Sequence, residues 1–426
     1  MSGGSVPYLL PHGGEGETIG LEEYRRRGGY EALRKAVRAL SPLQVKQVVA
    51  DSGLRGHGGA GFPTGRKWMS LREDAPHPRY LIANTDEMEP GTFKDRVLVS
   101  VNPHAVIEGM IIAGYAGSVR VGYFFVRPSY EKIVHGFEKA LSEAREEGFL
   151  GEGIVGGDYS FDIVVHRSAG RYICGETKGL VHALEGKRPH PNIEGHLTEA
   201  GLWGCPTLVD NVETLAHVPA IVRNGAGWFR SAGRHEHAPG HKVYSVSGWV
   251  KHPGAFELPF GTPLSEIIEK HAGGMKRQWP FKACLPGGAS TRYLSKKDYH
   301  AAMDFDSVQE IGRGHHLGTG AIVVFDQQTC LVAATLNMIR FFSRESCGWC
   351  TPCREGLPYM EDLLRRIEDG EGKEEYISRL CEMSVHMHRA YCAFAPGAVA
   401  PVEALVQDFS DEVREHLNGK GCPFRD

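Results

Sequence analysis

Residues 345–356 read ESCGWCTPCREG, in which two residues separate Cys347 from Cys350 and two more separate Cys350 from Cys353. Three thiolates on one tight turn can bind three corners of a cubane cluster, and one further cysteine completes the set. Zinc sites instead use two separated CxxC pairs, whereas here the middle cysteine would belong to both pairs. The spacing therefore favours a [4Fe–4S] cluster over zinc and over buried cysteines that bind nothing.

The fourth ligand has three candidates downstream of this cluster. Cys381 lies in a helical pattern and is expected in the core, and Cys422 stands close to the end of the sequence, in a segment typical of disorder. Cys392 lies in AYCAFAPG, where we expect a helix to stop before Pro396. Because a loop cysteine can orient toward a metal more freely, Cys392 is the predicted ligand. The remaining cysteines are expected to pack as small hydrophobic side chains: Cys174, Cys205, Cys284 and Cys330.

Composition limits the class of protein. The 426 residues carry a formal net charge of −4, which gives no indication of binding to nucleic acid or to an acidic membrane surface. Residues 1–15 show no signal-peptide pattern, and residues 5–17 are rich in proline and glycine and are expected to meander over the surface. No apolar run reaches the roughly 18 residues that a membrane span needs. Ten cysteines in such a chain indicate a metal site rather than a disulfide framework.

Upstream of the cluster, strand-like and helical segments alternate. The predicted strands are RYLIANT (79–85), VGYFFV (121–126) and YSFDIVVHRS (159–168), and the predicted helices are 104–117 and 129–148. This alternation predicts an α/β domain with a central sheet. From Lys242 two short strands, a Pro-Gly turn and one helix indicate a small α+β module, and after Thr329 apolar residues recur every three or four positions, which predicts a helical bundle.

Two loops of the α/β region are candidates for ligand binding. Residues 56–61, GHGGAG, match GxGxxG, but a helical stretch precedes them, so this is not a standard Rossmann turn. Five glycines between Gly56 and Gly65 can still expose backbone N–H groups to a flat ring, and a flexible surface loop is the alternative. The acidic loop, NTDEMEPG at 84–91, directly follows a predicted strand, where ligands bind in open α/β sheets; its alternative is a solvated turn.

Five motifs in order carry a resemblance over nearly the whole chain, from about Leu21 to Phe409: RGHGGAGFPTGRKW (55–68), NTDEMEPGTFKDR (84–96), RYICGE (171–176), NVETLAHVP (211–219) and ESCGWCTPCREG (345–356). The chain resembles the NADH-binding flavoprotein subunit of respiratory complex I, NADH:quinone oxidoreductase, in its proteobacterial form. NAD-linked hydrogenases and formate dehydrogenases contain the same type of subunit. The resemblance implies an α/β fold with a Rossmann-like FMN domain, a small ubiquitin-like β-grasp module and a C-terminal helical bundle that binds the cluster. The expected division is 1–50 (N-terminal helical segment), 51–240, 241–328 and 329–426, respectively.

The resemblance also implies the site residues. Cys347, Cys350, Cys353 and Cys392 match the cluster ligands. Phe62 and Glu89 match nucleotide contacts, and Glu89 is the residue expected in the catalytic site. The expected FMN contacts are Gly56, Gly58, Lys67, Asn84, Asp86, Glu87, Tyr172, Gly175, Glu176, Asn211 and Thr214.

The implied function is electron input: NADH reduces FMN, and electrons then pass singly to the [4Fe–4S] cluster. The implied partners are a small thioredoxin-like [2Fe–2S] subunit and a large iron–sulfur subunit of the same complex. Such a protein would be cytoplasmic, peripheral on the cytoplasmic face of the inner membrane, and would reach the membrane only through the complex.

The chain departs from the family pattern around the adenosine end of the nucleotide site. The second glutamate of the usual YICGEET motif is Thr177, followed by Lys178, and residues 192–199 lack the usual proline- and aromatic-containing loop. Three further departures are Ser70, His57 in place of arginine, and Asp210 in place of the first residue of an Asn-Asn pair. These changes predict a nucleotide choice that is relaxed or shifted toward NADPH. The alternative is an FMN/[4Fe–4S] module that exchanges electrons with a protein partner instead of NADH.

Overall fold

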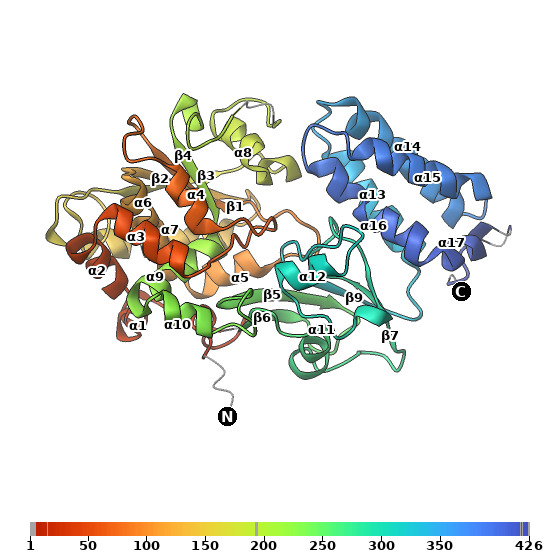
Figure 1. Ribbon diagram of the computed structural model, residues 1–426, viewed down its shortest axis with the longest axis horizontal. Helices are drawn as coiled ribbons and strands as arrows, with labels where there is room; N and C mark the ends of the chain where they lie inside the picture. Colours follow the sequence, from red (N-terminus) through yellow and green to blue (C-terminus); the bar gives the residue numbers. More distant parts are fainter. Residues whose placement is uncertain (1–5, 15, 192–194, 418, 420, 425–426) are drawn as a thin grey trace. The chain divides into compact units, whose positions relative to one another are not determined.

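The computed structural model describes residues 6–14, 16–191, 195–417, 419 and 421–424 and divides into two compact units (Figure 1). The first unit comprises Met1–Met88, Thr92–Ser245 and Gly254–Thr262. The second comprises Glu89–Gly91, Val246–Pro253 and Pro263–Asp426. Each unit is therefore assembled from segments that are distant in the sequence.

A four-stranded parallel sheet forms the centre of the first unit, with strand order β3-β2-β1-β4. Parallel strands covered on both faces are apolar along most of their length, which explains runs such as VGYFFV. The sheet confirms the predicted α/β fold and adds a strand that the sequence pattern did not reveal, β4. The bounds are β1 (Tyr80–Thr85), β2 (Val121–Val126), β3 (Asp162–Arg167) and β4 (Thr207–Asn211).

Helices cover this sheet, and their starts follow local capping rules. Ser41 and Gln44 form a capping box at the start of α3, with Pro42 in the first helical position, as the sequence predicts. The helices of the first unit are α1 (Leu21–Arg26), α2 (Glu31–Ala39), α3 (Pro42–Asp51), α4 (Thr64–Ser70), α5 (Lys94–Val101), α6 (Pro103–Gly117), α7 (Glu131–Glu146), α8 (Thr177–Leu184), α9 (Val212–Asn224) and α10 (Ala226–Ser231).

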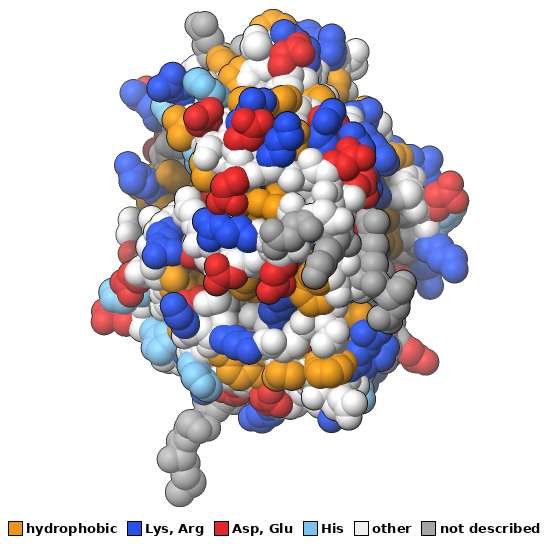
Figure 2. Space-filling view, turned by 90° about the vertical axis from the view of Figure 1, so that its right-hand side faces the viewer, with side chains coloured by type: hydrophobic (Ala, Val, Ile, Leu, Met, Phe, Trp, Pro, Cys, Tyr) orange, Lys and Arg blue, Asp and Glu red, His pale blue; other side chains and the backbone are white. Residues whose placement is uncertain are grey.

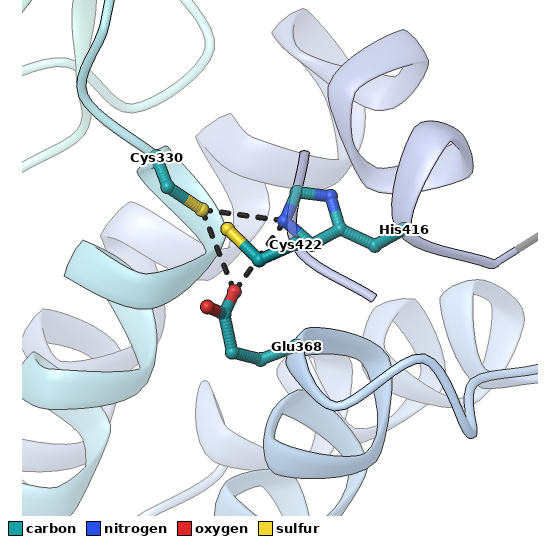
Figure 3. A group of neighbouring side chains, drawn as sticks. All are labelled: Cys330, Glu368, His416 and Cys422. Carbon is teal, nitrogen blue, oxygen red and sulfur yellow. Dashed lines mark hydrogen bonds and ion pairs between the residues drawn. The ribbon is translucent and has the colours of Figure 1, made fainter. Parts of the chain in front are cut away.

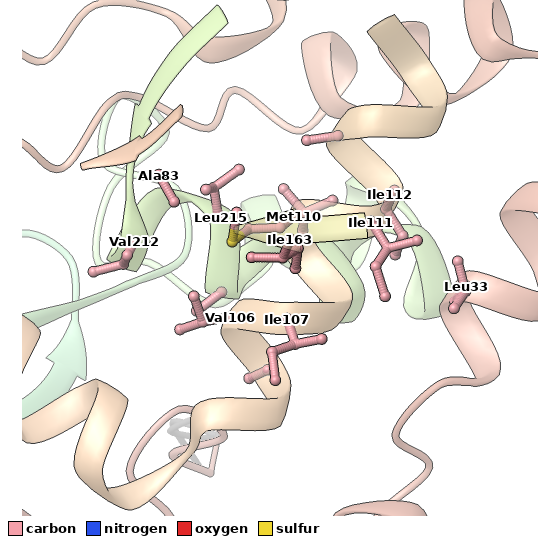
Figure 4. Close-up of a cluster of buried hydrophobic side chains, with 14 of the residues drawn as sticks. Leu33, Ala83, Val106, Ile107, Met110, Ile111, Ile112, Ile163, Val212 and Leu215 are labelled. Atoms are coloured by element: carbon pink, nitrogen blue, oxygen red, sulfur yellow. The ribbon is translucent and has the colours of Figure 1, made fainter. Parts of the chain in front are cut away.

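Helix α6 is the core helix of the first unit and is buried on nearly every side. Figure 4 shows Val106 and Met110 of α6 among Ala83 of β1 and Leu215 of α9. A side chain at Gly109 would place its Cβ 2.0 Å from the carbonyl oxygen of Leu215, so only glycine allows α6 and α9 to approach so closely. This packing fixes α9, and with it the helix N-terminus that follows β4.

The opening residues are not a simple surface segment, and that expectation is wrong for Leu9 and Leu10. Both side chains are buried, and the backbone N–H groups of Tyr8, Leu9 and Leu10 all donate to the carboxylate of Glu257 at 2.7–3.0 Å. The acceptor lies almost 250 residues away, so no local pattern could reveal it.

The segment from residue 241 contains a small mixed module. β5 (His241–Gly248) and β6 (Gly254–Pro259) are neighbouring strands. In the second unit, β7 pairs antiparallel with both β8 and β9. The remaining elements are α11 (Leu264–Glu266), which continues as a π-helical turn (Ile267–His271), β7 (Phe281–Leu285), β8 (Leu294–Ser295), α12 (Phe305–Glu310) and β9 (Ala321–Asp326).

A helical bundle follows, as predicted: α13 (Leu331–Glu345), α14 (Thr351–Glu368), α15 (Glu374–Met387), α16 (Phe394–Asp408) and α17 (Ser410–Leu417). Pro396 lies in the first turn of α16 and does not end a helix, because proline is tolerated where the N–H would be unpaired. Ion pairs such as Arg379–Glu375 line the outer helices, and Figure 2 shows acidic and basic side chains interspersed over one face. Among the described residues, no single helix is long and apolar enough to cross a membrane, although the sharply bent pair α5 and α6 passes that test together.

Candidate functional site

Three predicted site residues meet at the carboxyl ends of β1 and β4. The side-chain amide of Asn84 donates to the carbonyl oxygen of Gly175 at 3.0 Å, and its backbone carbonyl accepts from the Asn211 amide at 3.3 Å. Asn84 Oδ1 also accepts from the backbone N–H of Asp86 at 3.0 Å. The edge of the sheet where ligands bind in open α/β folds is therefore cross-linked by these polar side chains.

The glycine loop, residues 56–65, lies between α3 and α4, so a helix and not a strand precedes it, as predicted. Its backbone is anchored: Gly56 N–H donates to the carbonyl of Phe62 at 2.8 Å, and His57 N–H donates to Thr214 Oγ1 at 2.9 Å. A Cβ on Gly58 would lie 3.3 Å from the Cβ of Asn211. These contacts argue against a flexible surface loop and hold the glycine backbone against the start of α9.

Phe62 presents an accessible aromatic surface beside this loop. Its side chain is 46% exposed, and the Arg66 guanidinium lies 5.8 Å from the ring centroid. An exposed phenyl ring next to bare backbone can stack against a planar ligand. The geometry fits the predicted nucleotide contact, which stays a prediction.

The acidic loop is buried, so its interpretation as a solvated turn is wrong. Asp86 Oδ1 accepts from Ser168 Oγ at 2.9 Å. The Glu87 carboxylate accepts from the backbone N–H groups of Asp95 and Arg96 at the start of α5, at 2.8 and 3.3 Å, and from Tyr130 Oη at 2.9 Å. Burial raises the pKa of Glu87. Glu87 thus holds the loop against α5, and its contact with FMN stays a prediction.

Glu89 lies in the second unit, unlike the other predicted flavin and nucleotide residues. Its Oε1 accepts from the backbone N–H of Ser290 at 2.7 Å, and a Cβ on Gly288 would lie 2.6 Å from Glu89 Cγ. The loop around Gly288 therefore fixes the orientation of this side chain. Its catalytic role stays a prediction.

Lys67 and Asp210 form a partly buried ion pair. Lys67 Nζ lies 2.7 Å from Asp210 Oδ1 and donates to the carbonyl of Val209 at 2.9 Å, while Trp68 Nε1 donates to Asp210 Oδ2 at 2.8 Å. The Asp210 side chain is fully buried. The carboxylate that departs from the family pattern is therefore neutralised by the lysine predicted to contact FMN.

A buried charge cluster around Glu213 supports the same edge of the sheet, and the sequence interpretation missed it. Glu213 lies 2.8 Å from Lys94 Nζ, 3.4 Å from Lys242 Nζ and 2.8 Å from His57 Nδ1. Burial lowers the pKa of Lys242 to about 8, although Glu213 opposes this, and burial also lowers the pKa of His57. With two lysines around one glutamate, a neutral histidine is the better partner at position 57 than a third cation. The Asn211 side chain links this cluster to the sheet edge by accepting from Lys94 Nζ at 3.1 Å.

The departures near the nucleotide site lie at the start of α8. Glu176 caps this helix, with Oε2 accepting from the N–H groups of Lys178 and Gly179 at 3.0 and 2.8 Å, and burial raises its pKa. Thr177 is exposed and its hydroxyl donates to Glu176 Oε1 at 3.4 Å. Tyr172 begins the short 3₁₀ turn (Tyr172–Gly175) that precedes the cap. In the altered downstream loop, residues 192–194 lie outside the described residues.

The four predicted cluster cysteines come from two regions of the bundle. Cys347 and Cys350 precede α14, Cys353 lies in its first turn, and Cys392 lies between α15 and α16. Burial raises the pKa of Cys353 to about 12, and the thiols of Cys350, Cys347 and Cys392 raise it further, so all three lie close to it. Four thiols gathered in this way have the donor chemistry of a [4Fe–4S] site. Their assignment as ligands stays a prediction.

Two other cysteines differ from expectation. Cys381 is exposed, so the prediction that it packs in the core is wrong. Cys422 is buried although it lies near the end of the sequence, and it is close to Cys330. Cys174 and Cys284 are buried as predicted, and Cys205 is only half-buried.

Comparisons with known proteins agree with this geometry. Family profiles match at residues 49–220 (Nuo51 FMN-binding domain), 242–324 (SLBB domain) and 333–416 (NADH-ubiquinone oxidoreductase-F iron-sulfur binding region), which confirms the predicted fold class and cofactors. The F-type subunit of NADH-quinone oxidoreductase from Escherichia coli (strain K12) is 43% identical over 401 residues, or 93% of this chain and 89% of that protein. The corresponding F 2 protein of Rhizobium meliloti (strain 1021) is 43% identical over 95% of this chain and 96% of that protein. A solved NAD⁺-reducing [NiFe]-hydrogenase in its H₂-reduced state is similar with a TM-score of 0.80 and 33% identity; the match covers 93% of this chain and 65% of the hydrogenase chain.

Proposed function

The chain belongs to the NADH-quinone oxidoreductase-F family, and from this premise we propose that it admits electrons with a relaxed choice between NADH and NADPH. It is the electron-input subunit of complex I and therefore part of an enzyme, with an FMN-binding domain and a [4Fe–4S]-binding region. What is proposed beyond the family is the nucleotide preference and the role of individual residues.

When bound, FMN takes two electrons from the nucleotide and the cluster carries them onward one at a time. The chain's own residues provide a rigid support for the flavin. We assign the glycine loop, the amides of Asn84 and Asn211, and Lys67 to holding it, because these groups converge at the sheet edge and are braced by the Glu213 cluster. Phe62 is assigned to the nucleotide because its ring is exposed beside that loop.

The start of α8 carries the proposal on nucleotide choice. Related chains have two consecutive glutamates here, whereas this chain has only Glu176, whose Oε2 is used to cap the helix. A second carboxylate would repel the additional phosphate of NADPH, which carries nearly two negative charges. With an uncharged threonine at position 177 and Lys178 next to it, that repulsion is absent.

Flavin reduction tests this directly. Bleaching of the bound flavin is followed by stopped flow with NADH and with NADPH, in the wild type, in Thr177→Glu and in the matched uncharged variant Thr177→Gln. We expect the wild type to use both nucleotides and Thr177→Glu to gain roughly fivefold to tenfold selectivity for NADH through charge repulsion. Equal selectivity in the glutamate and glutamine variants would remove charge as the explanation.

The alternative function is an electron-transfer module that exchanges electrons with a protein partner. Retention of Phe62, with its accessible ring, favours nucleotide use. If neither nucleotide reduces the flavin at millimolar concentration, the alternative is supported and the first proposal fails.

We further propose the family assembly for this chain. The proposed partners are a small thioredoxin-like [2Fe–2S] subunit and a large iron–sulfur subunit, with attachment to the cytoplasmic face of the inner membrane only through them. The four-part division 1–50, 51–240, 241–328 and 329–426 is proposed on the same basis.

A further inference from the structure

A second set of metal-binding side chains lies in the bundle, separate in sequence from the predicted cluster cysteines. Cys330, Glu368, His416 and Cys422 are all buried, and their donor atoms lie within 4.8 Å of one another (Figure 3). They come from four places: the residue before α13, the end of α14, α17, and the segment after α17. Four donors of these types rarely meet inside a core without a purpose.

Their spacing fits a tetrahedral ion. Cys330 Sγ lies 3.3 Å from His416 Nε2 and 3.4 Å from Glu368 Oε2, and these last two atoms are 3.4 Å apart. A zinc ion with Zn–S near 2.3 Å and Zn–N or Zn–O near 2.1 Å has tetrahedral edges of roughly 3.4–3.6 Å. The three measured edges are close to these values.

A purely hydrogen-bonded cluster explains the spacing less well. Charge-assisted bonds between imidazolium and carboxylate are typically about 2.7–2.9 Å long. The His416–Glu368 distance of 3.4 Å is well outside that range. Three donors at nearly equal, longer separations are instead arranged as if around a common centre.

The surroundings orient the donors as metal sites require. His416 Nδ1 pairs with the carbonyl oxygen of Glu412 at 2.7 Å, which places the proton on Nδ1 and leaves Nε2 as the ligand atom. Cys330 Sγ accepts from the backbone N–H of Ala333 at 3.2 Å at the start of α13, where a thiolate is favoured. Lys282 Nζ lies 2.7 Å from Glu412 and 4.5 Å from the centroid of the Phe424 ring, next to the segment that carries Cys422.

The other candidate trio lacks this character. His57, Glu213 and His217 also lie close together, but Lys94 and Lys242 already supply positive charge to the same carboxylate. A divalent cation there would meet two buried ammonium groups. In the bundle site the glutamate instead lies beside a histidine that is itself a candidate ligand.

We propose that Cys330, Glu368, His416 and Cys422 bind one Zn²⁺ ion in a closed structural site. Two thiolates, one imidazole and one carboxylate suit zinc better than the harder cations calcium and magnesium. The ion joins the segment after α17 to the beginning of α13, and so links the two ends of the region that contains the predicted cluster cysteines. Because such a site forms only in the folded chain, its binding free energy stabilises the bundle.

The test uses the full chain, purified anaerobically with its cofactors, and compares Cys422→Ala with Cys381→Ala, an exposed cysteine outside the site. Zinc and iron are measured by elemental analysis and the cluster by electron paramagnetic resonance. We expect about one zinc per chain in the wild type and in Cys381→Ala, and its loss in Cys422→Ala with iron retained. A chelator should lower the melting temperature of the wild type and leave that of Cys422→Ala unchanged.

Cobalt gives a measurement that does not depend on whether a variant folds. Wild-type protein supplied with Co²⁺ in place of zinc should show the visible bands of a tetrahedral thiolate site. Equal zinc in the wild type and Cys422→Ala, absence of these cobalt bands, or a Cys330–Cys422 disulfide in the unreduced protein would each overturn the proposal. Loss of nucleotide activity would not bear on it, since the readouts are metal content and spectra.

Discussion

Replacing Asp210 by asparagine tests how the chain balances charge at the predicted FMN site. The Asp210 side chain is fully buried, accepts from Trp68 Nε1 at 2.8 Å and lies 2.7 Å from Lys67 Nζ, whose side chain is 28% exposed. Two unit charges about 4 Å apart attract by about 4 kcal/mol at an effective dielectric of 20. Partial exposure of Lys67 and the acceptor that asparagine retains reduce this, so we expect Asp210→Asn to lower the free energy of unfolding by about 2 kcal/mol.

The same change should raise affinity for FMN. It removes a negative charge beside the lysine assigned to the flavin, and we expect the Kd for FMN to fall by up to about tenfold, or 1.4 kcal/mol. Stability is measured by urea unfolding of the cofactor-free protein and binding by quenching of flavin fluorescence. Trp68→Phe is the control, because it removes the other hydrogen bond to Asp210 without changing any charge. FMN affinity that stays constant or falls together with stability in Asp210→Asn would refute the reasoning.

Three further changes test other parts of the structure. Burial lowers the pKa of Lys242 from 10.5 to about 8, so between these pH values the unfolded chain binds the additional proton and stability should rise with pH; Lys242→Met should lose this rise in urea unfolding, and parallel pH curves would contradict it. Glu87→Gln should lower stability by about 1–3 kcal/mol in thermal unfolding, because two N–H groups of α5 lose their carboxylate acceptor, and Tyr130→Phe should cost less; equal losses would argue against the capping role. Cys392→Ser should lose cluster iron and its paramagnetic signal whereas Cys381→Ser keeps both, and an intact cluster in the first variant would exclude Cys392 as a ligand.

Local pattern is a reliable guide wherever the physics is local. Strand–helix alternation predicts the parallel sheet, and the Ser41 capping box marks the start of α3 correctly. Pattern fails where a helix face has to be chosen. Leu380 is buried while the next residue, Cys381, is exposed, and periodicity alone does not tell which neighbour faces the core. The prediction for Pro396 is wrong because proline occurs near both ends of helices.

The sequence by itself determined which chemistry the chain can support. Three cysteines on one turn predict a cluster because the spacing that brings thiolates together is set within a single turn. The glycine and acidic loops predict a ligand site for a similar local reason.

Only the tertiary structure decided how charge is distributed around those motifs. Asp210 is neutralised by Lys67 from α4, Glu213 is held by Lys94 and Lys242, and the proposed zinc ligands Cys330 and Cys422 stand at opposite ends of the bundle sequence. These contacts join residues far apart in the sequence, and their energies depend on burial, which exists only after the chain has folded.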